Sequence, residues 1–92
     1  TDIIPDKFYV SPNYPNPFNP VTTIKYGLNV SGDVIMYLFD IRGAMVQTLV
    51  NEYHSAGFYE LTFDGSKLAS GVYFYSTIAN GIVKTHKLVL LK

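Results

Sequence analysis

The sequence contains neither cysteine nor tryptophan, and no run of apolar residues approaches the length of a membrane-spanning helix. Without cysteine, disulfide bonds cannot stabilise the fold and thiol chemistry is excluded. A membrane-spanning helix needs about 20 predominantly apolar residues in succession, so the sequence predicts no membrane span. The fold of this chain must therefore rest on its hydrophobic core.

Acidic residues are absent after Asp64. All seven Asp and Glu residues lie at or before this position beside three cations, which gives that part a side-chain charge of −4. The remaining residues carry four lysines and no acid, hence +4, and the whole chain is neutral. The lysines either mark an interaction surface or keep the last strands soluble. A neutral chain has no electrostatic footprint for nucleic acid, so no such partner is expected.

Residues suited to catalysis or metal binding are few. Only His54 and His86 could act as a base, and their spacing matches no recurrent zinc pattern. The aspartates at strand ends (Asp33, Asp40 and Asp64) are expected to form turns, since no loop has the dense carboxylate spacing of a calcium site. A chain of 92 residues also leaves little room for a catalytic cleft. We therefore expect no enzyme activity, no metal and no cofactor.

Apolar residues make up 48% of the chain, enough for a folded core. Alternation places Val34, Met36 and Leu38 on one face of a strand, and residues 40–43 and 80–81 predict tight turns. Strands are predicted at residues 8–10, 22–26, 33–40, 45–50, 57–64, 71–78 and 82–91. This spacing predicts an all-β fold, an immunoglobulin-like antiparallel β-sandwich of about seven strands.

Prolines cluster between the first two predicted strands, at positions 12, 15, 17 and 20. Each proline fixes its own φ, lacks an N–H donor and favours extended geometry in the residue before it. Residues 12–20 are therefore predicted to form an extended strap, with turns stabilised by asparagine side chains. We expect Tyr14 and Phe18 to anchor the strap to the core. Residues 1–7 are interpreted as a linker remnant, and residues 8–92 as a single domain.

Three motifs occur together in a fixed order. Residues 16–20 read Asn-Pro-Phe-Asn-Pro and precede Thr-Thr-Ile, residues 70–75 read Ser-Gly-Val-Tyr-Phe-Tyr, and residues 87–92 form an apolar stretch framed by lysines. In this order the motifs resemble the type A C-terminal sorting domain of the type IX secretion system, also called the Por secretion system. A weaker similarity, limited to the turns at residues 40–43 and 63–65 and the Gly-x-Tyr strand, runs to the immunoglobulin-like domain of the flagellar hook-capping protein.

The resemblance implies a non-catalytic module attached to a cargo domain on its N-terminal side. Such a module takes its cargo through the periplasm and the outer-membrane export machinery to the cell surface or medium, and a sortase-like peptidase then removes it. In the family, the Gly-x-Tyr segment and the terminal strand are associated with recognition by the machinery. The matching positions are Gly71, Tyr73, Lys87, Val89 and Lys92.

One strand departs from the family pattern. Ile35 and Tyr37, together with Phe39, occupy the face on which such domains usually carry polar residues. An exposed apolar stripe often marks a contact surface. Alternatively, the strap or a neighbouring loop covers these side chains, and this second interpretation is the one we expect.

The rival function is a carbohydrate-binding or spacer β-sandwich of a secreted multidomain glycoside hydrolase. Eight tyrosines could supply stacking surfaces for sugars, but tryptophan is absent and several tyrosines fall at core positions. A sugar-binding module also has no need of a lysine-framed terminal strand. The sequence therefore favours the sorting function.

Overall fold

The computed structural model describes residues 4–92, and this part of the chain contains strands and no helix. The predicted all-β fold of seven strands is confirmed. In order, the strands are β1 (Tyr9–Val10), β2 (Val21–Leu28), β3 (Gly32–Asp40), β4 (Met45–His54), β5 (Gly57–Asp64), β6 (Gly71–Ala79) and β7 (Ile82–Leu90). Over these residues, no segment qualifies as a membrane-spanning helix.

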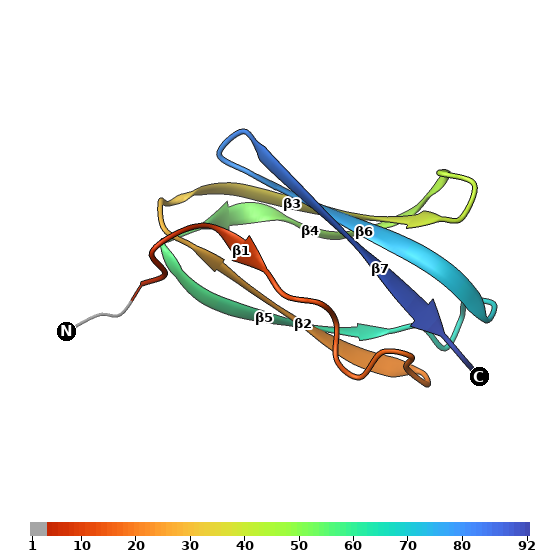
Figure 1. The fold of residues 1–92 in the computed structure, drawn as a ribbon. Helices are drawn as coiled ribbons and strands as arrows, with labels where there is room; N and C mark the ends of the chain where they lie inside the picture. The colour runs from red at the N-terminus through yellow and green to blue at the C-terminus, as the bar shows by residue number, and fades with distance from the viewer. Residues whose placement is uncertain (1–3) are drawn as a thin grey trace.

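The strands form two antiparallel sheets that pack face to face (Figure 1). The three-stranded sheet has the order β1-β2-β5, and the four-stranded sheet has the order β4-β3-β6-β7. Strand β7 therefore lies at one edge of the larger sheet, next to β6, while β3 and β6 are its central strands. This arrangement is the predicted β-sandwich.

The core lies between the sheets and follows the predicted alternation. Val34, Met36 and Leu38 are completely buried, as expected from the sequence. At the β7 edge of the larger sheet, Leu88 and Leu90 are buried as well. Central and edge strands of the four-stranded sheet therefore supply side chains to one continuous core.

Two of the predicted turns form as expected. The side chain of Asp40 accepts hydrogen bonds from the backbone N–H groups of Arg42 and Ala44, and Gly43 takes a φ of 86°. These bonds, the one from Ala44 above all, hold the pKa of Asp40 below its usual value. At the other hairpin, Asn80 and Gly81 have φ values of 50° and 79°, the pairing that suits a two-residue loop.

Strand β4 is longer than the predicted strand at residues 45–50, since it continues to His54. The nearby Gly57 predicts an exposed turn at His54, and this prediction is wrong. Its ring is buried, stacks on Tyr59 with centroids 4.0 Å apart, and its Nε2 lies 2.8 Å from the Tyr26 hydroxyl. Tyr59 and Tyr26 therefore hold the imidazole in place at the edge of the core.

The strap is anchored differently from the sequence prediction. Phe18 is buried to 2% exposure and contacts the ring of Phe63 edge-on, as expected. Tyr14, by contrast, is 82% exposed, so its predicted anchoring role is wrong. Its backbone pairs with Thr23 of β2, which turns the side chain outward. Asn13 takes the inward position, where its Nδ2 donates to Thr22 Oγ1.

The boundary between linker and domain remains a prediction. Residues 1–3 lie outside the described residues, and residues 4–7 form no strand. Pro5 is nevertheless buried, whereas Ile4, Asp6 and Lys7 are exposed.

Candidate recognition surface

The five predicted recognition residues lie on the β6–β7 hairpin and the residues that follow it. The register pairs Gly71 with Leu90, Val72 with Val89 and Phe74 with Lys87. Gly71 and Val89 therefore lie close together at the open end of the hairpin, and Lys87 lies closer to the hairpin turn on β7. The structure gathers these positions on one supersecondary unit, but their side chains do not share one face.

Tyr73 points into the sandwich. It is 8% exposed, and its hydroxyl donates to the carbonyl oxygen of Ala69 at 2.7 Å. This bond ties the start of β6 to the loop before it. Tyr73 is thus placed to maintain the shape of the hairpin, and its ring offers little surface to a partner.

Gly71 has a φ of 156°, a backbone conformation that L side chains rarely adopt. No atom lies within 4 Å of the position where a Cβ would stand, so space alone does not require glycine here. The requirement is conformational, because only glycine reaches this region without strain.

Lys87 and Val89 project from the opposite face, away from the core. Alternation along β7 buries Leu88 and Leu90 and leaves Lys87 exposed and Val89 half-buried. Lys92 follows the strand, where its backbone N–H donates to Ser70 Oγ at 3.0 Å and its Nζ to the Ser66 carbonyl oxygen at 2.6 Å. The side-chain ammonium group of Lys92 therefore contacts the loop between β5 and β6.

The strap pairs with the exposed edge of β7, a relationship that sequence reasoning missed. Phe18 N donates to Val89 O and Leu91 N donates to Phe18 O, each at 3.0 Å. Asn16 adds two side-chain bonds: its Oδ1 accepts from Val89 N at 3.0 Å, and its Nδ2 donates to Lys87 O at 3.4 Å. In Figure 1 the strap passes beside the end of β7 that leads to the C-terminus.

Residues 16–20 and 87–92, the two motifs nearest the ends of the domain, are thus hydrogen-bonded to each other. Between Lys87 and Leu91 the backbone of β7 is already paired and cannot receive a strand from another protein. Only the side chains of this segment remain available for recognition.

A sequence profile of the secretion system C-terminal sorting domain matches residues 13–91, which include the first two motifs and all of the third except Lys92. The chain belongs to this family. No curated protein matches the chain. The sorting domain carries a signal for type IX secretion, and a protein that bears it is destined for export toward the cell surface or the medium.

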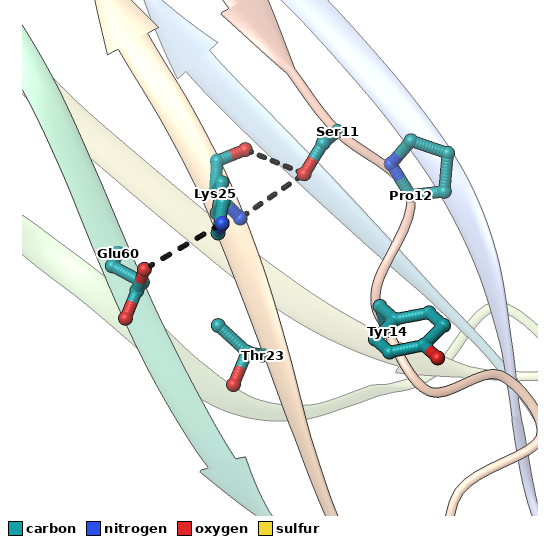
Figure 2. A pocket seen from close by; sticks show the side chains of 6 residues that line it. All are labelled: Ser11, Pro12, Tyr14, Thr23, Lys25 and Glu60. Atoms are coloured by element: carbon teal, nitrogen blue, oxygen red, sulfur yellow. Dashed lines mark hydrogen bonds and ion pairs between the residues drawn. The ribbon is translucent and has the colours of Figure 1, made fainter.

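The sorting domain also has a surface cleft of about 540 Å³ on the outer side of the three-stranded sheet. Figure 2 shows Ser11, Pro12, Tyr14, Thr23, Lys25 and Glu60 around it. Lys25 Nζ lies 4.0 Å from Glu60 Oε1, and both side chains are about two-thirds exposed. The cleft therefore combines an exposed aromatic ring with an ion pair that can exchange hydrogen bonds with a ligand.

Metal chemistry has no support in residues 4–92. No group of three or more histidine, cysteine or acidic side chains comes together there. His86 lies against Tyr75, with ring centroids 5.5 Å apart, and His54 is held by Tyr26. Both histidines therefore have packing partners within the sandwich.

Proposed function

We propose that the sorting domain directs an attached cargo protein through the outer-membrane type IX export machinery and is then cleaved off by a sortase-like peptidase. In this proposal the domain crosses the periplasm folded and catalyses no step itself. The cargo is attached on its N-terminal side.

The observation that carries the proposal is the pairing of the strap with β7. Asn16 and Phe18 hold residues 87–91 in a defined position, so two of the three family motifs make one local structure. Fixed in this way, the exposed Lys87 would be presented to a receptor in one defined position.

We assign recognition to two kinds of residue. Lys87, Val89 and Lys92 present side chains outside the core and are proposed to contact the machinery. Gly71 and Tyr73 are proposed to act indirectly, because the glycine conformation and the Tyr73–Ala69 hydrogen bond set the geometry of the hairpin that carries the others.

The test is fusion of the domain to a secreted fluorescent reporter in a host that has the export machinery. The reporter should reach the surface or medium, and its mass should show that the domain has been removed. The same reporter without the domain, and the fusion in a strain lacking the machinery, should both remain periplasmic. Retention of the intact fusion in the complete host would contradict the proposal.

A second candidate function is sugar binding at the cleft of Figure 2. It is favoured by Tyr14, whose exposed ring is held on the strap by two backbone hydrogen bonds to Thr23. Stacking on Tyr14 with hydrogen bonds to Lys25 and Glu60 would suit a neutral sugar. Binding of soluble oligosaccharides that Tyr14→Ala abolishes would support this function, and no binding at millimolar concentration would exclude it.

A further inference from the structure

The outer face of the four-stranded sheet is largely apolar. Antiparallel sandwich sheets usually pair a buried apolar face with a polar solvated one. Strands β3 and β6 break this pattern, since their burial alternates but most of their outward positions are apolar, the exceptions being Asp33 and Ser76. The apolar outward residues are Ile35, Tyr37 and Phe39 on β3, Val72, Phe74 and Ile78 on β6, and Val83 and Val89 on β7.

On β3 these side chains follow one another without a break, whereas on β6 and β7 the hydrogen-bonded pair Ser76 and Thr85 lies between Phe74 and Ile78. The register places Phe39 directly beside Phe74, and Ile35 directly beside Ile78. Tyr37 also contacts Phe39, with ring centroids 6.2 Å apart. At the rim Val83 is 59% exposed. We call this surface the outer apolar face.

The strap does not cover the outer apolar face, contrary to the expectation from the sequence. Its hydrogen bonds go to β2 and to the edge of β7. Ile35 and Tyr37 lie on β3, which is separated from β7 by β6, and both point away from the core. They are half-buried between their neighbours within the sheet itself.

Charge is scarce on the outer apolar face. Among the outward positions of β3, β6 and β7, only Asp33 at one end and Lys87 are ionised at neutral pH. Lys87 pairs directly with Phe74, so one ammonium group stands beside the aromatic part of the face. A complementary partner would present an apolar patch and a carboxylate opposite Lys87.

The size of the outer apolar face suits a transient partner. Three strands spaced by about 4.8 Å and about nine residues long cover roughly 14 by 30 Å. Covering that area on both partners would bury about 860 Å² in total, in the range of weak, transient protein interfaces. A permanent dimer of this chain would need a larger contact, whereas a brief docking event during export does not.

We propose that the outer apolar face is the docking surface for a protein component of the export machinery, through a flat apolar patch with a carboxylate that meets Lys87. This inference rests on the proposed sorting function, and it extends recognition from the terminal strand to the central strands β3 and β6. Phe74 and Tyr37 are the central contacts.

The first test compares export of reporter fusions that carry substitutions on either outer surface of the sandwich. Phe74→Thr and Val83→Asp change the outer apolar face, and Val83 is exposed enough that its replacement leaves the fold intact. Phe58→Thr is the matched control, because Phe58 is a 54% exposed aromatic residue on the three-stranded sheet. Export should fall at least about tenfold for the first two variants, as for loss of a central aromatic contact, and stay unchanged for the control.

The second test identifies the occupant. A photo-crosslinking amino acid is placed at position 83 or, as control, at position 58 in export-competent cells. A crosslink from position 83 to an outer-membrane export protein, absent from position 58, is expected. A crosslink to a second copy of the chain, or to lipid alone, would overturn the proposal, as would wild-type export of Val83→Asp. If the unmodified fusion is not exported at all, the sorting function itself has failed, which is a separate result.

Discussion

The side-chain amide of Asn16 bonds both the N–H of Val89 and the carbonyl oxygen of Lys87, across 73 and 71 residues of sequence. With the backbone pairing of Phe18, this contact makes the strap an additional partner of β7. An edge strand with free backbone groups invites unspecific pairing. Here the strap closes the part of the edge that carries Lys87 and Val89.

Replacing Asn16 with alanine should destabilise the domain by about 0.5–1.5 kcal/mol, the usual net contribution of hydrogen bonds that water can partly replace. The loss should appear as a lower midpoint in urea with an unchanged slope. Asn51→Ala, at an exposed position of β4, is the control and should change little. Equal midpoints for both variants would show that the Asn16 contact does not stabilise the strap.

Phe18→Ala should destabilise the domain by about 3–5 kcal/mol, because it removes a buried aromatic side chain. Tyr14→Ala should change stability by less than about 0.5 kcal/mol, since its ring is exposed. Thermal unfolding of the two variants measures both effects. Similar losses for the two would mean that the strap uses Tyr14 as an anchor after all.

Tyr73→Ala should cost about 3–5 kcal/mol as a large-to-small change in the core. Tyr73→Phe keeps the ring and removes only the hydrogen bond to Ala69, so a loss of about 0.5–1.5 kcal/mol is expected. Denaturant unfolding separates the two contributions. A melting temperature unchanged by Tyr73→Ala would disprove the structural role of this residue.

Alkaline pH should weaken the fold through Tyr26 and Tyr75. Burial raises the pKa of each phenol from 10.0 to about 12. The folded state therefore keeps these protons while the unfolded chain loses them, so this contribution to stability is complete below pH 10 and is lost as the pH rises toward about 12. When phenolate absorbance is followed against pH, the wild type should show one more tyrosine ionising near pH 12 than Tyr75→Phe does. If the absorbance difference between the two proteins is complete near pH 10, the assigned burial is contradicted.

The local parts of the fold could be predicted from the sequence. Alternation placed Val34, Met36 and Leu38 in the core because a strand facing a core has a period of two. The turn at Asn80 and Gly81 was equally clear, because few residues tolerate positive φ in succession. Such features depend on neighbours in the chain and leave a direct pattern.

Long-range relationships could not be predicted in this way. Four prolines indicate an extended strap, but φ restraints do not say which strand it pairs with or which way Tyr14 points. The end of β4 was missed for a related reason. Register shifts between β3 and β4, next to Met36 and Leu38, disturb the alternation along this edge strand. The sequence predicted part of the outer apolar face, at Ile35 and Tyr37. Its continuation to Phe74 could not be predicted, because it depends on β3 and β6 being neighbours in the sheet.

The most direct measurement of the central claim pairs the fold and the export of one variant, Lys87→Glu with Lys92→Glu. Exposed charges contribute little to stability, so circular dichroism and thermal unfolding of the purified variant should match the wild type within about 1 kcal/mol. Its reporter fusion should nevertheless remain in the periplasm, and Lys67→Glu with Lys25→Glu, exposed lysines elsewhere, should be exported normally. A folded Lys87→Glu, Lys92→Glu variant whose reporter reaches the surface at the wild-type level would contradict the account.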